Sequence, residues 1–264
     1  MGRQGLYADP MVYDILYTPG TAGEVTAFEK LENLFPPGKL KENRLWFEPA
    51  CGTGRYLRVA LGRGRQVAGF DLDEGQLTYA RSRLKGPPGG LFTADMTDFQ
   101  AAAQHAGLKP GSIDFAFNPV NSIRHLDNDK TMLAHLEQMA FFLKPGALYV
   151  VGLSLTDYDQ LLPEEDLWQA ARGRCRVSQL VNYLPPEPGT TRARLEQVIS
   201  HLTVERPRET RHFDDTYDLR CYDEKQWRDL VGRSRLDHAG SFDAFAEPRE
   251  GRAPAYQLEV LRKS

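Results

Sequence analysis

Short apolar segments alternate with amphipathic segments through the middle of the chain. The amphipathic segments, residues 74–84 and 132–143, repeat apolar residues at steps of three and four, the period of a helix with one buried face. Strands that alternate with helices need crossover connections, which make the sheet parallel, so the pattern predicts an α/β core. The apolar runs, each with the length of a buried strand, lie at 45–47, 66–70, 89–94, 113–117 and 147–153.

The pattern differs on the two sides of this core. Before it, Thr21 can cap a helix that turns Val25, Phe28 and Leu31 to one side. After it, residues 155–170 are acidic, and we expect them to be partly helical. Three segments with β character follow, and the turns between them predict an antiparallel arrangement. These segments lie at 175–184, 194–205 and 211–221.

Together the patterns predict an α/β fold that is Rossmann-like and doubly wound. We expect a mostly parallel seven-stranded sheet with an antiparallel β insertion after strand five. Helix and strand patterns return near the C-terminus and would complete the main sheet. The expected parts are an N-terminal helical lead-in at 1–41, a ligand-binding core at 42–154, a β lid at 155–222 and the completion of the core at 223–264.

Composition narrows the functional classes. Of the 264 residues, 41% are hydrophobic and 26% are charged, and the net charge of -3 gives no general attraction to nucleic acid or anionic membranes. The apolar run at 147–153 is too short to span a bilayer, and residues 1–10 lack the apolar region of a secretory signal. Cys51, Cys175 and Cys221 form no C-x-x-C pair, so we expect a reduced, cytoplasmic protein without bound metal.

The first core strand runs into a glycine-rich turn, Glu48-Pro49-Ala50-Cys51-Gly52-Thr53-Gly54. Gly52 and Gly54 permit positive φ and close approach to a ligand, and the helix that follows offers free N–H groups. A dinucleotide site needs a third glycine, but Leu57 occupies that position. A phosphate gains nothing from the carboxylate of Glu48, which suits an ammonium or sulfonium group. The turn therefore favours a cationic ligand.

More acidic residues follow the next strands. Asp71 ends the second strand 23 residues after Glu48. This is close to the spacing of about 20 that is typical of an acid that accepts hydrogen bonds from ribose hydroxyls. Asp73 is the better helix cap, which leaves Asp71 for a ligand. Asp95 and Met96 follow the third strand. Because the carboxyl ends of parallel strands lie at one edge of a sheet, we expect these residues to share one binding site.

This combination resembles class I S-adenosylmethionine-dependent methyltransferases over about residues 40–153. The glycine-rich turn is similar to their motif I, an acid followed by G-x-G-x-G, with Ala50 in place of the first glycine. The resemblance implies S-adenosylmethionine as cofactor, with Asp95 accepting from the adenine amino group and Met96 packing on the ring. It implies a cofactor site made of Tyr13, Tyr17, Glu48, Ala50, Cys51, Gly52, Gly54, Asp71, Leu72, Asp95, Met96 and Asn118.

The segment after the fourth strand should face the reacting methyl group. Asn118-Pro119 is similar to the N-P-P-[YF] motif of adenine- and glutamine-directed enzymes, but Val120 and Asn121 replace the second proline and the aromatic residue. Ser122-Ile123-Arg124-His125-Leu126 is more similar to S-I-x-H-L of small-molecule N-methyltransferases of the amino-sugar and glycine N-methyltransferase-like branch. There the histidine lies beside the acceptor amine. His125 is thus a candidate general base, with a packing role as the alternative.

The N-terminal segment and the insertion extend this interpretation. Tyr13-Asp14-Ile15-Leu16-Tyr17 is similar to the Y-D-x-x-Y helix of the same enzymes, whose tyrosines close over the methionine end of the cofactor. We interpret Arg124 and the arginines of the insertion as exposed charges, with recognition of an anionic substrate or RNA as the alternative. The insertion arginines are Arg172, Arg174, Arg176, Arg192, Arg194, Arg206, Arg208 and Arg211.

The sequence therefore predicts an enzyme that transfers a methyl group to the nitrogen or oxygen of a small-molecule acceptor by in-line displacement. Three competing hypotheses are a nucleic-acid or protein methyltransferase on the same core, a NAD-type oxidoreductase, and a non-catalytic protein that binds S-adenosylmethionine. Nucleic acid and membranes are not expected partners. Exposed strand edges of the insertion could pair two subunits into a homodimer.

Overall fold

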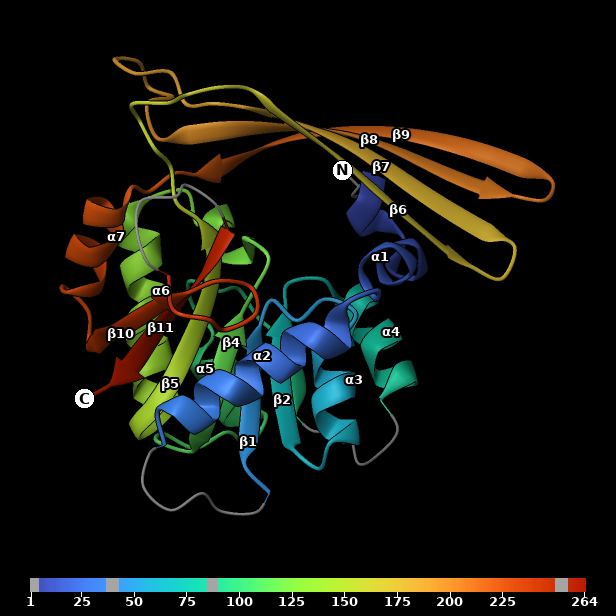
Figure 1. Cartoon of the computed structure of the whole chain (residues 1–264). Helices are drawn as coiled ribbons and strands as arrows, with labels where there is room; N and C mark the ends of the chain where they lie inside the picture. The colour runs from blue at the N-terminus through green and yellow to red at the C-terminus, as the bar shows by residue number, and fades with distance from the viewer. Residues whose placement is uncertain (1–4, 37–42, 85–89, 250–255) are drawn as a thin grey trace.

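The computed structural model describes residues 5–36, 43–84, 90–249 and 256–264 (Figure 1). The main sheet has seven strands, and in spatial order they are β10 (Leu236–Phe242), β11 (Tyr256–Lys263), β5 (Leu143–Ser154), β4 (Ile113–Asn118), β1 (Leu45–Pro49), β2 (Gln66–Asp71) and β3 (Leu91–Thr93). Neighbouring strands are parallel, except that β11 runs antiparallel to both β5 and β10. The predicted mostly parallel, seven-stranded sheet is therefore confirmed.

Helices cover both faces of this sheet (Figure 1). One face packs against α2 (Thr21–Leu34), α3 (Arg55–Gly62) and α4 (Glu74–Arg83), and the other against α5 (Gln100–His105), α6 (Asp129–Phe142) and α7 (Glu224–Val231). Successive strand residues serve opposite layers, so that Trp46 lies in one apolar core and Phe47 in the other. Within the described ranges, no helix is long and apolar enough to cross a membrane.

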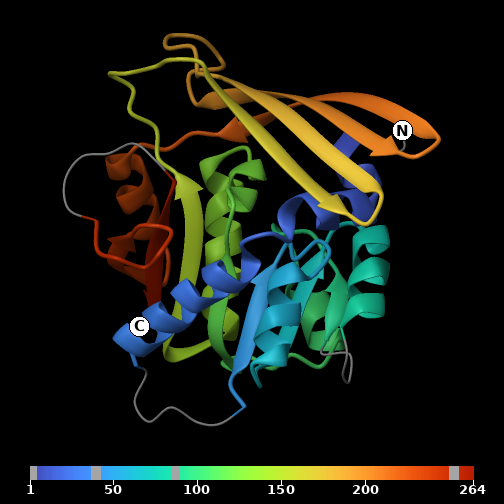
Figure 2. The same ribbon diagram turned by 45° about the vertical axis from the view of Figure 1, so that its right-hand side comes forward.

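A second, antiparallel sheet lies beyond the carboxyl edge of the main sheet, and we call it the lid (Figure 2). Its four strands, in both chain and spatial order, are β6 (Glu164–Arg172), β7 (Cys175–Leu184), β8 (Leu195–Arg206) and β9 (Glu209–Arg220). The 3-10 helix η1 (Gly5–Ala8) and helix α1 (Pro10–Tyr17) lie beneath it. Apolar side chains of α1 and of the lid form a small core of their own, to which Val12, Ile15, Val177 and Leu202 belong.

Three local expectations were wrong or incomplete. Residues 155–170 were expected to be partly helical, but Glu164–Arg172 is strand β6, paired with β7 along its whole length. This long-range pairing overrides the local helix preference of the acidic residues. Thr21 does not cap α2, because Gly20 occupies the cap position with a φ of 86° and the Thr21 hydroxyl donates to the Thr18 carbonyl at 2.8 Å. Helix α5 was not anticipated.

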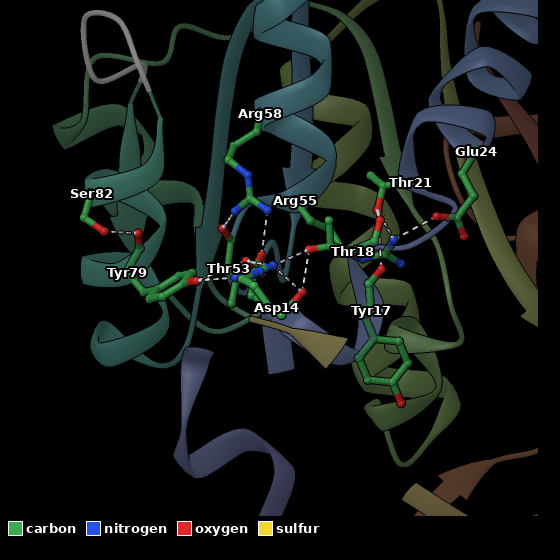
Figure 3. A network of polar contacts seen from close by, with 11 residues as sticks. Asp14, Tyr17, Thr18, Thr21, Glu24, Thr53, Arg55, Arg58, Tyr79 and Ser82 are labelled. Atoms are coloured by element: carbon green, nitrogen blue, oxygen red, sulfur yellow. Dashed lines mark hydrogen bonds and ion pairs between the residues drawn. The ribbon is translucent and has the colours of Figure 1, made fainter. Parts of the chain in front are cut away.

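Asp14 of α1 connects the N-terminal segment, the core and the lid (Figure 3). Its buried carboxylate lies 2.6 Å from Arg58 of α3 and 2.8 Å from Arg172 of β6, and it accepts a hydrogen bond from the Tyr79 hydroxyl of α4 at 3.0 Å. Burial alone would raise the pKa of Asp14, but the two arginines outweigh it and hold the pKa below its ordinary value. The carboxylate is therefore ionised, and it fixes the lid against the core.

The substitution Asp14→Asn should loosen this junction. The neutral amide leaves two guanidinium groups without their anion. Breaking a buried ion pair lowers the free energy of unfolding by about 3 to 5 kcal/mol. We expect about 3 kcal/mol here, because Arg172 is partly exposed. We expect amide hydrogen exchange to accelerate in residues 10–17 and 164–172 more than in β1 and β4. The control is Asp218→Asn, which breaks an exposed ion pair with Arg192 and should change neither quantity. If Asp14→Asn changed amide exchange equally in all these segments and left the free energy of unfolding unchanged, Asp14 would not be the junction between the core and the lid.

Candidate active site

A cavity of about 1130 Å³ is bounded by the carboxyl edge of the main sheet on one side and by the lid on the other. Its core wall comes from the turns after β1, β2, β3 and β4, and its outer wall from residues of the lid. Figure 2 shows the lid sheet opposite this edge of the main sheet. The structure brings most of the predicted site residues to this one space. Those that line it are Tyr13, Tyr17, Ala50, Gly52, Asp71, Leu72, Asp95, Met96 and His125.

Two predicted residues lie behind the core wall. Glu48 and Asn118 are buried at the ends of β1 and β4. Among the described residues, neither Oε2 of Glu48 nor Oδ1 of Asn118 has a hydrogen-bond partner. Burial raises the pKa of the Glu48 carboxyl well above its ordinary range. Because a buried carboxylate is unfavourable without compensation, this position favours a positive group nearby.

Three residues with positive φ shape the turn after β1. Ala50, Gly52 and Gly54 have φ values of 52°, 51° and 65°. Ala50 keeps the left-handed conformation that glycine would adopt freely, at a cost of about 1 kcal/mol. A Cβ atom on Gly54 would lie 3.3 Å from that of Ala80, so this glycine lets α3 pack closely on α4. Cys51 is buried beneath the turn, with its N–H donating to a carbonyl of β2 at 2.8 Å.

Asp71 fixes this turn and lines the cavity. Its Oδ2 accepts from the Gly52 N–H at 2.8 Å, and its Oδ1 accepts from the Asp73 N–H at 2.9 Å. Each carboxylate oxygen can accept more than one hydrogen bond, the property that recognition of ligand hydroxyls would require. Leu72 beside it is 56% exposed and gives the rim an apolar side chain.

The turn after β3 is supported from behind. Asp95 accepts from the N–H and from the hydroxyl of Thr97, both at 2.7 Å. The Met96 carbonyl lies 3.0 Å from Nδ1 of His135, whose Nε2 lies 2.8 Å from the Tyr149 hydroxyl. Since a carbonyl only accepts, Nδ1 of His135 carries the proton and Nε2 accepts from Tyr149. Burial lowers the pKa of His135 to about 4, so this ring is a neutral support for Met96.

His125 lies where the core, the N-terminal segment and the lid meet. It ends the 3-10 helix η2 (Ser122–His125), which follows β4. Its ring centroid is 6.4 Å from that of Tyr7 and 5.4 Å from that of Tyr217 on β9. The turn that leads to η2 contains Val120 with a φ of 59°, a strained conformation for a β-branched residue. Strain of this kind clusters at functional sites.

The N-terminal tyrosines form an aromatic wall of the cavity. Ring centroids are 5.8 Å apart for Tyr7 and Tyr13 and 4.9 Å apart for Tyr13 and Tyr17. The Tyr17 hydroxyl donates to Oε1 of Gln179 on β7 at 2.9 Å, which attaches the wall to the lid. Tyr13 and Tyr17 thus line the same cavity as the core turns.

Sequence reasoning missed several residues that line the cavity. Gln76 of α4 is buried, and its Nε2 donates to the Tyr7 carbonyl at 3.1 Å. Its Oε1 has no hydrogen-bond partner within the described part of the chain. Trp168, Tyr183 and Tyr217 contribute from the lid. Their strands alternate in polarity, but the inner face of a sheet is defined only once the register is known.

Arg124 was interpreted as an exposed charge, and this was wrong because the residue is buried. Its Nη2 lies 2.9 Å from Oε2 of Glu196, and its Nε donates to the Arg220 carbonyl at 2.9 Å. A desolvated guanidinium needs such partners, and here they join η2 to β8 and β9. Several insertion arginines also have carboxylate partners: Arg172, Arg192, Arg194, Arg206 and Arg211.

Comparisons with known proteins find similarity to methyltransferases. Residues 47–146 match a family model described as a methyltransferase domain. The dTDP-3-amino-3,4,6-trideoxy-alpha-D-glucopyranose N,N-dimethyltransferase of Streptomyces venezuelae is 29% identical over 182 residues, or 67% of this chain and 69% of that protein. The crystal structure of Streptomyces venezuelae DesVI superposes with a TM-score of 0.74 at 21% identity, covering 96% of this chain and 98% of that one. The structure of CalS10, an amino pentose methyltransferase from Micromonospora echinaspora with bound S-adenosylmethionine, superposes with a TM-score of 0.66 at 18% identity. The match covers 92% of this chain and 90% of that one.

The buried His135 predicts how stability depends on pH. Its pKa is about 4 in the folded chain and about 6.5 when unfolded. Between these values mainly the unfolded chain binds the proton, so the free energy of unfolding falls as the pH drops, by about 1.6 kcal/mol between pH 6.5 and 5. Denaturant titrations across this range should show a shallower slope for His135→Gln. The exposed His105, changed to Gln, should keep the wild-type slope, and equal slopes for all three proteins would contradict the assignment.

Proposed function

Because the chain is a class I S-adenosylmethionine-dependent methyltransferase, we propose that it methylates an amino group of a small molecule, with an amino sugar as the acceptor class. One observation carries the proposal: a single cavity connects the predicted cofactor residues with the lid, and His125 lies between them. The relative from Streptomyces venezuelae methylates the amino group of a nucleotide-linked sugar, and CalS10 is an amino pentose methyltransferase. The proposal thus selects nitrogen over oxygen as the nucleophile.

The residues present fit S-adenosylmethionine. The cofactor carries a sulfonium and an ammonium group, and the buried Oε2 of Glu48 lacks a hydrogen-bond partner among the described atoms. Asp71 would accept from the ribose hydroxyls, while Asp95 and Met96 would hold the adenine. Tyr13 and Tyr17 would cover the methionine end. When bound, the cofactor supplies a methyl carbon that its sulfonium makes electrophilic.

The chain's own residues would position the acceptor, exclude water and remove a proton. An amine is mostly protonated near neutral pH and attacks only after it loses that proton. Imidazole is the side chain suited to accept a proton in this range, so His125 is the proposed general base. The aromatic wall and the lid would hold the amine in line with the methyl carbon at about 3 to 3.5 Å, which accounts for much of the rate.

An oxidoreductase activity, a non-catalytic role and a nucleic-acid substrate fit less well. The chain is an enzyme of the methyltransferase class, which sets aside a NAD-type oxidoreductase and a non-catalytic binding protein. Nucleic acid is a poor fit, because carboxylates such as Asp127, Asp166 and Asp215 line the cavity and would repel phosphates. A cytoplasmic location, a homodimer and the separate roles of the four parts of the chain stay predictions.

Calorimetric titration with S-adenosylhomocysteine tests the cofactor site. We expect micromolar binding to the wild type and a loss of about 1.5 to 3 kcal/mol, or roughly 10- to 100-fold, in Asp71→Ala, the value of a hydrogen bond to a charged group. Asp71→Asn keeps the shape of the side chain and one acceptor oxygen, so it should lose less binding free energy than Asp71→Ala. Asp98→Ala, on an exposed side chain outside the cavity lining, should bind like the wild type. A folded wild type that binds no S-adenosylhomocysteine would refute the cofactor assignment.

The substitution His125→Gln should separate catalysis from binding. If His125 is the base, kcat falls by about 100- to 10,000-fold, while the affinity for S-adenosylhomocysteine stays within about twofold. The dependence of kcat on pH should change with it, because turnover would then follow the acceptor's own deprotonation. A packing role predicts a different outcome, namely a lower melting temperature with an unchanged pH profile.

A further inference from the structure

The register of the lid places acidic and aromatic side chains on its inner face. In one row across the sheet, Glu164 is opposite Tyr183, and Val198 is opposite both Tyr183 and Tyr217. In the next row on the same face, Asp166 and Asp215 lie at the two ends, with Val181 and Ser200 between them. Side chains two positions apart on a strand share a face, so both rows face the cavity.

Carboxylates dominate the charge of this cavity. The carboxylates among its described lining residues are Glu24, Asp71, Asp95, Asp127, Glu164, Asp166, Glu196 and Asp215. The same lining contains one guanidinium group, Arg124, and that group is already committed to Glu196. No lysine lines the cavity within the described part of the chain. A phosphorylated acceptor would thus meet repulsion from the lid without a cation to bind it.

The aromatic residues reinforce this preference for positive charge. Tyr183 and Tyr217 border the acidic rows, and Trp168 lies on the same face two residues beyond Asp166. Aromatic faces attract ammonium groups. Burial, followed by the nearby carboxylates of Asp166 and Glu196, raises the pKa of Tyr183 to about 12, so its ring stays neutral.

The core end of the same cavity points to a ligand independently. Gln76 is 3% exposed, and its Oε1 lacks a partner among the described residues. It lies close to Gly52, since a Cβ atom built on that glycine would be 4.0 Å from Oε1. Buried acceptors are normally satisfied, so this end calls for a donor from a bound molecule. The acidic lid is therefore the outer half of a binding cavity and not only a charged surface.

We propose that the acceptor is an unphosphorylated small molecule with at least two amino groups, such as a diamino sugar or a diamino cyclitol. This inference rests on the proposed function. One ammonium group binds at the acidic inner face of the lid, along the row that ends in Asp166 and Asp215, while a second amine lies near His125. Methylation of that amine forms a nitrogen–carbon bond, breaks the sulfur–carbon bond of the donor, and transfers one proton from nitrogen to His125 and then to solvent.

The test is calorimetric titration of the wild type, saturated with S-adenosylhomocysteine, with three probes. These are 2-deoxystreptamine with two amines, glucosamine with one, and UDP-glucosamine with one amine and a diphosphate. We expect 2-deoxystreptamine to bind at least about tenfold more tightly than glucosamine, and UDP-glucosamine to bind most weakly. Binding of 2-deoxystreptamine should weaken as salt rises, because exposed charges are screened.

A double variant, Asp166→Asn with Asp215→Asn, identifies the subsite. It should lower the affinity for 2-deoxystreptamine by about tenfold or more and leave that for S-adenosylhomocysteine unchanged. The matched control is Asp214→Asn, which removes a charge from the adjacent position on β9, on the opposite face and 79% exposed. Tighter binding of UDP-glucosamine, no binding of 2-deoxystreptamine, or an unaffected double variant overturns the inference. Failure to bind S-adenosylhomocysteine would instead overturn the proposed function.

Discussion

The buried carboxylate of Asp14 is the constraint on which the site depends. It pairs with Arg58 of the core and Arg172 of the lid, and it accepts from Tyr79. An isolated charge at this depth would be strongly unfavourable, so the three elements must stay together for it to be satisfied. Helix α1 is thereby held between the core and the lid, and its tyrosines face the cavity. One polar junction thus holds the core turns, the aromatic wall of tyrosines and the lid in fixed positions relative to one another.

The proposed methyl transfer to an amine would explain why carboxylates surround so much of the cavity. The donor carries a sulfonium, an amine acceptor would be an ammonium at neutral pH, and negative charge stabilises both. The same carboxylates oppose catalysis in one respect, because they favour the protonated amine, which is not nucleophilic. A nearby base would resolve this conflict. His125, the proposed base, lies between Tyr7 and Tyr217 at the meeting point of core and lid.

Much of the core could be predicted from the sequence, because buried parallel strands and amphipathic helices have distinct periods. The glycine-rich turn and Asp71 were predictable for the same reason, since parallel strands end at one edge. The lid was harder. Strand β6 is acidic and owes its conformation to pairing with β7, which no local pattern shows. Tyr183, Tyr217 and the buried Arg124 became recognisable only when register and packing placed them. Partner-dependent features of this kind are absent from single-sequence periodicity.

Methyl transfer itself is the most direct test of the proposed function. The protein would be incubated with S-adenosylmethionine labelled at the methyl group and with 2-deoxystreptamine, and the products would be analysed by mass spectrometry with fragmentation. We expect label on a nitrogen of the acceptor and an equal amount of S-adenosylhomocysteine. Label on oxygen, or no labelled product from a protein that binds S-adenosylhomocysteine, would contradict the proposal.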